Sequence, residues 1–501
     1  MILKALIFCF QNTYIFYNIW IEQSFVTIVR FVTIVRIDFK YYYYLTINIM
    51  KKTDVLIIGG SAGGMVTAHT GKAHWPGKDF ILVKKQKDVM VPCGIPYIFG
   101  TLDSINKNIM PVDAMMEKSN ITSIVDEAVS IDHEAKTVKF ASGEVIGYDK
   151  LVIGTGSTPV KPKWLQGADK EGVFVVPKDK YYLDDMLQKL SSMRKIAIVG
   201  AGFIGVELAD EMNKRGYEIT LIEKLPHILN LAFDVELSSE IHKMLVERGV
   251  KIITGTGISK VIGDNKVSQI ELEDGSIMDM DAVILSIGYK PNSSLAKDSG
   301  IPVDQDGFII VDEYMRTLVK DVFAVGDCAQ KRDFVTRKRV STMLASTACA
   351  EARIAGMNLF NLHVVKTFSG TIAIYSTAIG NTGFGTAGVT EQRANEEGLE
   401  TFSAVFESVN RHPGNLPDAH KQIVKLITAR YSGVIIGGEV IGGLEAGELT
   451  NVIGLAIQNR MTVNNLLSIQ IGTHPCLTAS PAVYPLIKAA EMIAIRMLHS
   501  K

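Results

Sequence analysis

The sequence predicts an α/β protein in which buried parallel strands alternate with helices. Two short apolar runs, Asp54–Ile58 and Lys195–Val199, each end in a glycine-rich turn that leads into a helical pattern. The two turns lie about 140 residues apart. Glycines in such a turn let the backbone approach a pyrophosphate, which then meets the N–H groups of the helix N-terminus. The pattern therefore indicates two Rossmann-like dinucleotide-binding domains.

The composition is that of an ordinary globular protein. The chain has 501 residues, 47% hydrophobic and 21% charged, and this length predicts roughly three domains. A formal net charge of -1 without a long basic run argues against nucleic acid as the main partner. The cysteines show no CxxC spacing, which suits a reducing cytoplasm and predicts neither a disulfide framework nor a metal site. They are Cys9, Cys93, Cys328, Cys349 and Cys476.

The first 49 residues differ from the rest. The hexapeptide at 25–30 is repeated at 31–36, and four tyrosines follow at 41–44. Residues 1–21 are apolar but are interrupted by polar residues, so a membrane-spanning helix is not expected. We expect residues 1–49 to be an extension outside the fold, with Met50 as the natural start and a membrane anchor as the alternative. The intact mass of the native protein distinguishes the two.

The first glycine turn has the pattern GxSxxG. Its residues are Gly59, Gly60, Ser61, Ala62, Gly63 and Gly64. The next strand, Phe80–Val83, should end in an acid that holds the ribose hydroxyls. It ends instead in Lys84, and no acid lies between Asp79 and Asp88. We expect either that Lys84 contacts the adenosine part by another route or that this nucleotide is held less conventionally.

A second strand and turn close this unit. The run Tyr148–Ile153 leads into a tight turn that contains Thr155 and Gly156. The stretch Trp164–Val176 then shows little regularity and is predicted to be a linker.

The second glycine turn is a full GxGxxG, with Gly200, Gly202 and Gly205. An amphipathic helix is predicted through Lys214. The following strand ends at Glu223, at about the interval that the dinucleotide fingerprint requires. Because a carboxylate there accepts hydrogen bonds from a free 2′-hydroxyl and repels a 2′-phosphate, we expect NADH to be preferred over NADPH.

Two later strands end in turns of the same kind. The first leads into Gly288, and the second ends in Gly326-Asp327, where one carboxylate can point at a polyol. Two dinucleotide units in one chain suggest a flavin in one and a nicotinamide cofactor in the other. Cys328 and Cys349 are interpreted as packing residues.

The segment Pro92–Tyr97 contains a cysteine between residues that force a turn, with a second proline where a helix would begin. A thiol at a helix N-terminus faces unpaired N–H groups and the positive end of the helix dipole, and both favour the thiolate. Cys93 lies after the first glycine turn and the second strand, where the edge of a flavin is expected. We therefore expect FAD and a nicotinamide cofactor to lie on two sides of one reactive sulfur.

These features together resemble the pyridine nucleotide–disulfide oxidoreductases of the glutathione reductase fold, from Lys51 to about Lys501. A lone cysteine in CGxPY is similar to the single-cysteine branch, which contains coenzyme A-disulfide and polysulfide reductases, NADH oxidases and NADH peroxidases. The dithiol branch needs CxxxxC, and Cys93 has no such companion. The resemblance implies FAD on the first turn and Asp327, NAD(H) on the second turn and Glu223, and a homodimer.

The resemblance also implies a domain organisation. Residues 50–165 and 295–365 form a discontinuous FAD-binding domain, 166–294 an NAD(H)-binding domain, and 366–501 an α+β dimerisation domain.

Two C-terminal loops depart from the resemblance. Where the family tends to have aromatic residues, this chain has Arg411–Gly414 and Thr473–Cys476. His474 resembles the acid–base histidine of the dithiol reductases, but the acid five residues on is replaced by Ala479. A surface or helix-cap histidine is the alternative for His474 and for His412. Cys476 is either a second redox thiol or an interface packing residue.

The predicted function is electron transfer from NADH through FAD to Cys93 and on to a small disulfide, persulfide or polysulfide, with His474 of the partner subunit as a proton donor. One alternative is an NADH oxidase or peroxidase that reduces oxygen or peroxide. Another is a flavoprotein reductase of a protein electron acceptor. No membrane span is expected.

Overall fold

This computed structural model describes residues 7–10, 13–16 and 50–500. The chain divides into two units, Met1–Lys51 and Lys52–Lys501. In the first unit, strands β1 (Ile7–Phe10) and β2 (Thr13–Phe16) pair in antiparallel fashion. The repeat at 25–36 and the tyrosine run at 41–44 lie outside the described residues, and the predicted extension at 1–49 stays a prediction. Over the part of the chain that is described, no helix is both long and apolar enough to cross a bilayer.

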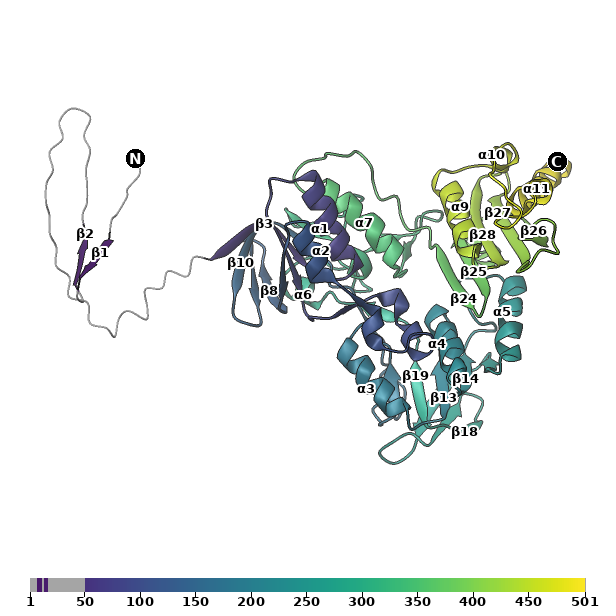
Figure 1. Cartoon of the computed structure of the whole chain (residues 1–501), viewed down its shortest axis with the longest axis horizontal. Coiled ribbons are helices and arrows are strands. Elements are labelled where there is room, and N and C mark those ends of the chain that lie inside the picture. Colours follow the sequence, from purple (N-terminus) through teal and green to yellow (C-terminus); the bar gives the residue numbers. More distant parts are fainter. Residues whose placement is uncertain (1–6, 11–12, 17–49, 501) are drawn as a thin grey trace. The chain divides into compact units, whose positions relative to one another are not determined.

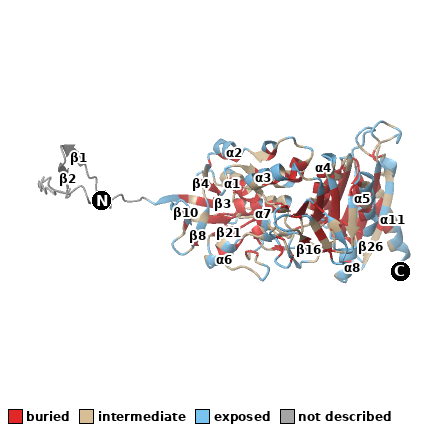
Figure 2. Ribbon diagram, turned by 90° about the horizontal axis from the view of Figure 1, so that it is seen from below, coloured by how far each residue is buried: buried red, intermediate tan, exposed pale blue. Residues whose placement is uncertain are grey.

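The first sheet of the second unit has seven strands, in the order β7-β4-β3-β10-β9-β8 with β21 beside β10 (Figure 1). Their bounds are β3 Lys51–Ile58, β4 Phe80–Lys84, β7 Thr122–Val125, β8 Ala128–Asp132, β9 Thr137–Phe140, β10 Val145–Ile153 and β21 Val322–Ala324. The β3–β4 and β4–β7 pairs are parallel. The strands predicted at Asp54–Ile58 and Phe80–Val83 are confirmed as β3 and β4. Buried residues, red in Figure 2, run along the strands.

Helices α1 (Ala62–His74) and α7 (Ala345–Met357) lie side by side at this sheet (Figure 1). They approach closely because Gly71 faces Gly356, where an added Cβ would lie 2.9 Å from the Gly71 amide nitrogen. The short helix α2 (Val112–Lys118) comes after the paired strands β5 (Val89–Met90) and β6 (Ile109–Met110). The turn after β3 and the turn after β21 therefore belong to the same sheet, which packs with α1 and α7.

The second sheet has five parallel strands, in the order β12-β19-β13-β14-β15. Their bounds are β12 Val173–Val175, β13 Lys195–Val199, β14 Glu218–Glu223, β15 Lys251–Thr254 and β19 Ala282–Leu285. Its helices are α3 (Lys180–Leu190), α4 (Phe203–Lys214) and α5 (Val235–Glu247). An antiparallel meander of β16 (Ile258–Ile262), β17 (Gln269–Leu272) and β18 (Ile277–Asp279) accompanies it.

The predicted linker at Trp164–Val176 is partly wrong, because its last residues form β12. This strand is only three residues long and pairs with β19, which lies more than 100 residues later. Pairing with a distant strand, rather than the local sequence, makes it a strand. The predicted helix through Lys214 is confirmed.

The two sheets are joined by an antiparallel ribbon of β11 (Ser157–Pro159) and β20 (Tyr289–Pro291), with α6 (Ser294–Asp298) directly after it. A second short ribbon pairs β22 (Lys331–Arg332) with β23 (Arg339–Val340). The first ribbon carries the chain out of one dinucleotide unit and back into it.

The C-terminal part is a five-stranded antiparallel sheet, in the order β24-β25-β28-β27-β26. Its strands are β24 Tyr375–Ile379, β25 Thr382–Gly388, β26 Thr401–Val409, β27 Lys421–Ala429 and β28 Ile435–Gly442. Its helices are α8 Glu391–Glu396, α9 Ala446–Gln458, α10 Val463–Leu467 and α11 Pro485–His499. The sheet and helices enclose a separate apolar core, as the predicted α+β arrangement requires. The exact domain boundaries stay predictions.

A buried lysine ties this C-terminal sheet to the second sheet. The Lys425 ammonium, from β27, lies 3.0 Å from the Asp234 carboxylate and 3.1 Å from that of Glu391, and its side chain is 2% exposed. Glu236 lies 3.2 Å away. Asp234 also accepts the backbone N–H groups of the first turn of α8. Because Asp234 is itself buried, removal of the lysine leaves this carboxylate without its compensating cation.

Lys425→Met should lower the free energy of unfolding by about 3–5 kcal/mol, the usual cost of breaking a buried pair. Urea unfolding of the apoprotein measures it. Lys421→Met is the matched control on the same strand. Its ammonium pairs with Glu407 at the surface, so less than about 1 kcal/mol is expected. Equal midpoints and slopes for both variants would contradict the clamp.

Candidate functional site

The first glycine turn comes directly after β3 and is sterically closed to side chains. Gly59 has φ +123°, and a Cβ there would lie 2.1 Å from the Gly154 carbonyl oxygen. A Cβ on Gly64 would lie 1.8 Å from the Gly59 carbonyl oxygen. Ser61 precedes α1, but its side chain makes no capping hydrogen bond, and the first turn has no acid. The helix N-terminus therefore presents N–H groups suited to an anion.

Lys84 lies beside this turn, and its ammonium group forms an ion pair with Asp113. Its side chain is 2% exposed, and its Nζ donates to the Lys87 carbonyl at 2.7 Å and to Asp113 at 2.9 Å. A Cβ on Gly60 would lie 2.6 Å from the Lys84 Cβ. The Ser123 hydroxyl and the Lys84 ammonium lower the pKa of Asp113. The position at which the fingerprint requires an acid thus holds a buried lysine that is paired with an exposed aspartate. Contact of Lys84 with adenosine stays a prediction.

Asp327 comes directly after Gly326 in a single turn of 3₁₀ helix, Gly326–Cys328. Its carboxylate accepts hydrogen bonds from the Lys178 ammonium at 2.6 Å and the Ser157 hydroxyl at 2.7 Å. Burial opposes ionisation, but the Lys178 charge and these hydrogen bonds keep the pKa of Asp327 below its ordinary value. Asp327 is therefore a largely buried anion. The sequence gives no signal for Lys178, which comes from the chain between β12 and α3.

Thr155, Gly156 and Gly288 lie where the two dinucleotide units meet. The Thr155 hydroxyl donates to the Asn292 carbonyl, and the Asn292 amide donates back to the Thr155 carbonyl at 3.1 Å. Gly156 has φ +73° and Gly288 has φ +107°. A Cβ on either would meet no heavy atom within 4 Å. The backbone at both positions is thus open to close approach by a ligand.

The second glycine turn repeats the geometry of the first. A Cβ on Gly205 would lie 1.9 Å from the Gly200 carbonyl oxygen, whereas one on Gly202 would meet no heavy atom within 4 Å. Gly202 precedes α4, whose N-terminus has no side-chain cap. Glu223, at the end of β14, accepts the Ala201 N–H at 2.7 Å. The predicted acid thus lies at the second turn, beside the open end of α4.

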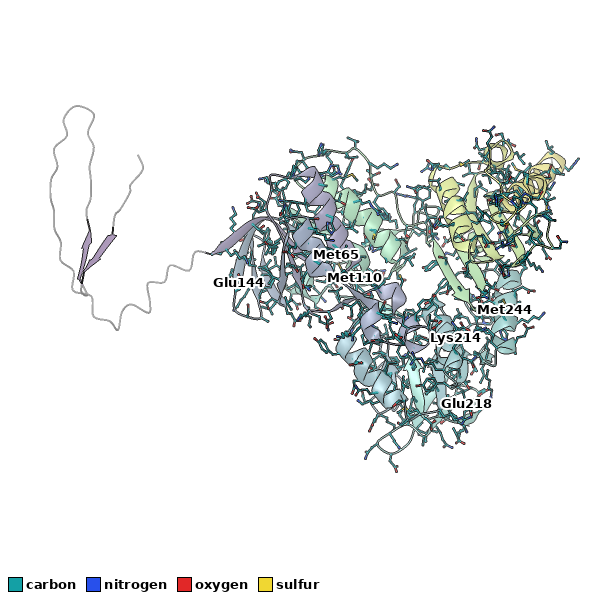
Figure 3. All side chains as sticks on the ribbon, viewed as in Figure 1. Met65, Met110, Glu144, Lys214, Glu218 and Met244 are labelled. Atoms are coloured by element: carbon teal, nitrogen blue, oxygen red, sulfur yellow. The ribbon has the colours of Figure 1, made fainter. Side chains whose placement is uncertain are left out.

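Cys93 lies in a turn of 3₁₀ helix, Pro92–Gly94, and is exposed. A second 3₁₀ turn, Pro96–Phe99, comes next and packs on α4. The contact with α4 continues at Thr101, whose hydroxyl donates to the buried Glu211 at 3.0 Å. Figure 3 labels Lys214, from the last turn of α4, which pairs with Glu211. The second dinucleotide unit therefore holds the cysteine segment in place.

The predicted stabilisation of the Cys93 thiolate is wrong for the polypeptide alone. Desolvation, followed by the charge of Glu207, raises the pKa of the thiol, and Lys178 only partly opposes this. The predicted helix N-terminus is a three-residue turn with a proline at its start. Such a turn has few aligned peptide dipoles, so partial desolvation of the sulfur and the nearby carboxylate outweigh it, although the residue as a whole is exposed.

Glu207 is a residue that the sequence interpretation missed. It lies on α4 one turn before Glu211, so both side chains face the cysteine segment. Burial, with a further contribution from Glu211, raises the pKa of Glu207 to about 7. The sequence does contain a signal for it. Glu207 comes two residues after the GxGxxG turn, and Glu211 follows four residues later on the same face of the helix.

The C-terminal loops contact each other within the chain. The His412 N–H donates to the Pro475 carbonyl at 3.2 Å, and His412 Nδ1 lies 3.1 Å from the Thr478 carbonyl. His474 Nδ1 accepts the Cys476 N–H at 3.2 Å. Cys476 is exposed. The structure thus brings His412, His474 and Cys476 together, while their approach to Cys93 of a partner subunit stays a prediction.

The other cysteines are consistent with packing roles. Cys328 is fully buried and its Sγ faces the Ile153 and Val325 carbonyls, whereas Cys349 is half-buried on α7. Among the described residues, no group of three or more histidine, cysteine or acidic side chains is arranged to hold a metal ion.

Two family models match the chain. One, described as "Pyridine nucleotide-disulphide oxidoreductase", matches residues 53–352, and the other, its dimerisation domain, matches residues 374–482. An NADH oxidase of Methanocaldococcus jannaschii is 28% identical over 459 residues, which cover 89% of this chain and 99% of the relative. A CoA-dependent NAD(P)H sulfur oxidoreductase of Pyrococcus abyssi is 30% identical, covering 79% of this chain and 90% of the relative.

A solved structure supports the same family assignment. The chain resembles an NAD-dependent persulfide reductase from A. fulgidus with a TM-score of 0.82 and 29% identity, over 89% of this chain and 84% of that one.

Glu207→Gln should increase the alkylation rate of Cys93 by iodoacetamide at pH 8, because loss of the carboxylate charge lowers the pKa of the thiol. Mass spectrometry of the reduced protein measures the rate at this residue. Glu218→Gln is the control, since Glu218 lies at the start of β14 and pairs with Arg194. A slower or unchanged rate in Glu207→Gln would show that this charge does not act on the thiol.

Proposed function

The chain belongs to the pyridine nucleotide-disulphide oxidoreductase family, and on that premise we propose that it is an FAD-dependent NADH oxidoreductase that delivers electrons through Cys93 to a small disulfide, persulfide or polysulfide. One observation carries this proposal. The exposed Cys93 thiol lies close enough to Asp327, at the first dinucleotide-binding unit, and to Glu207 and Lys178, from the second, for their charges to act on it. One sulfur adjoining both nucleotide units is the arrangement that such a relay needs.

The residues present fit the two cofactors. Both glycine turns end at helix N-termini without side-chain caps, which suits a pyrophosphate at each. The first turn and the largely buried anion Asp327 would hold FAD, the latter by accepting hydrogen bonds from the polyol. Thr155, Gly156 and Gly288 lie at the junction, where the backbone is open. The second turn and Glu223 would hold NADH, and the carboxylate would repel a 2′-phosphate.

When bound, the two cofactors supply the two-electron transfer. The polypeptide supplies the sulfur and the protons. Cys93 in a mixed disulfide, persulfide or sulfenate form takes up two electrons, and its bond to the outer sulfur or oxygen breaks. The Cys93 thiolate that results attacks the next disulfide or polysulfide sulfur, and the departing thiolate takes a proton. Glu207, with a pKa of about 7, and the partner subunit's His474 are the proposed proton donors.

A second candidate function is reduction of oxygen or peroxide by the same two-electron chemistry, with Cys93 cycling through the sulfenate. The NADH oxidase of M. jannaschii, which aligns over 99% of its length, favours it. Oxygen consumption without added disulfide distinguishes the two. The dimerisation-domain match supports a homodimer, and the scattered cysteines support a cytoplasmic location.

Cys93→Ser should lower disulfide or polysulfide turnover by about 100-fold or more, because the nucleophile is lost. Flavin reduction by NADH should keep its rate. Anaerobic stopped-flow with NADH, followed by coenzyme A disulfide, polysulfide, peroxide and oxygen, measures both steps. Cys349→Ser is the matched control and should keep its turnover. Undiminished disulfide turnover in Cys93→Ser would exclude the sulfur as the relay.

Glu223→Gln should reduce the preference for NADH over NADPH by about tenfold, because it removes the charge repulsion but keeps an acceptor for the Ala201 N–H. The ratio of kcat/KM for the two cofactors measures it. Glu218→Gln, at the other end of the same strand, should leave the ratio unchanged. A wild-type enzyme that prefers NADPH would contradict the role of Glu223.

A further inference from the structure

A buried ion pair lies directly behind the turn that carries Asp327. Lys331, from β22, and Glu351, from α7, are both 0% exposed, with Nζ and Oε1 3.5 Å apart. Two ionisable side chains without solvent are expensive to bury, and their mutual attraction often fails to repay the cost. Neither Lys331 nor Glu351 is among the residues predicted to bind a cofactor. Because their burial is costly, we expect their contacts to serve a function other than packing.

Both side chains hold the peptide groups of one residue, Gly326. The Lys331 ammonium donates to the Gly326 carbonyl at 2.6 Å and to the Ala329 carbonyl at 2.9 Å. The Glu351 carboxylate accepts the Gly326 N–H at 2.7 Å. Gly326 has φ +77°, a conformation that few other residues adopt. The pair thus holds both the N–H and the C=O of Gly326, and glycine has more conformational freedom than any other residue.

The next residue is Asp327, whose carboxylate accepts hydrogen bonds from Lys178 and Ser157. The turn is therefore held by two sets of charged partners, Lys331 and Glu351 at the Gly326 peptide and Lys178 at the Asp327 side chain. A charge-assisted hydrogen bond is about twice as strong as a neutral one, so this arrangement restricts the turn more than neutral partners would.

From this geometry we propose that Lys331 and Glu351 are positioning residues of the flavin site. They hold the Gly326 peptide so that the Asp327 carboxylate is preorganised for the polyol, and their charges set part of the electrostatic potential there. The proposal rests on the assignment of FAD to Asp327 under the proposed function. Preorganisation lowers the entropic cost of binding, so loss of the pair should change cofactor affinity.

The test is FAD affinity of the full-length apoprotein, measured by quenching of flavin fluorescence. Lys331→Met should raise the Kd about 10- to 100-fold, the usual effect of losing hydrogen bonds from a charged group. Glu351→Gln keeps an acceptor for the Gly326 N–H, so its Kd should rise less than that of Glu351→Ala. This order tests the hydrogen bond itself, and Glu351→Gln also serves if Lys331→Met does not fold.

A second readout separates positioning from mere loss of stability. The midpoint potential of the bound flavin should become more positive in Glu351→Gln at pH 8.5, where the buried carboxylate, whose pKa burial raises to about 7, is charged in the wild type. The shift should shrink as the pH falls below 7, because the wild-type carboxyl group is then neutral as well. Lys425→Met is the control for a destabilised protein, because its lysine lies in the other buried cluster, and its FAD affinity and potential should be those of the wild type.

Asp327→Asn distinguishes failure of this inference from failure of the proposed function. Wild-type Kd in the Lys331 and Glu351 variants and a wild-type potential in Glu351→Gln, with weakened FAD binding in Asp327→Asn, would overturn the positioning role alone. Wild-type affinity in Asp327→Asn as well would overturn the assignment of FAD to this turn.

Discussion

The charges around Cys93 are the constraint on which the proposed chemistry depends. Desolvation and the Glu207 carboxylate favour the protonated thiol, and the Lys178 ammonium partly opposes them. Asp327 and Lys178 come from the surroundings of one nucleotide turn and Glu207 from the helix of the other. Under the proposed function, a sulfur in this position would receive electrons from the flavin and would need a nearby proton donor. The raised pKa of Glu207 supplies a group that titrates near neutral pH.

The two glycine turns have the same backbone geometry. In each, a strand ends in glycines whose Cβ atoms would clash with a neighbouring carbonyl, so the chain turns tightly and exposes a helix N-terminus. The units differ at the end of their second strand. Glu223 keeps its carboxylate near the turn, where backbone N–H groups hold it. Lys84 instead occupies the equivalent place with a buried ammonium, so the two nucleotides would be held by different chemistry at their ribose ends.

The sequence predicts the local elements well and the long-range pairs poorly. The helix that ends at Lys214 can be predicted from its periodicity and the glycine beyond it. The contact of Lys178 with Asp327 joins residues 149 positions apart, and nothing in either neighbourhood indicates it. The same holds for Lys331 and Glu351. The thiolate prediction is wrong because the local dipole argument is visible in the sequence, whereas the desolvation and the Glu207 charge arise only when the chain is folded.

The central claim is that Cys93 stores electrons received from a reduced flavin. Anaerobic titration of the oxidised holoenzyme with NADH counts these electrons directly. The claim predicts that about two equivalents of NADH per subunit are consumed before reduction is complete, because a flavin and an oxidised sulfur each accept two electrons. Cys93→Ser should consume about one equivalent. Complete reduction of the wild-type enzyme by a single equivalent, equal to that of the variant, would contradict the claim.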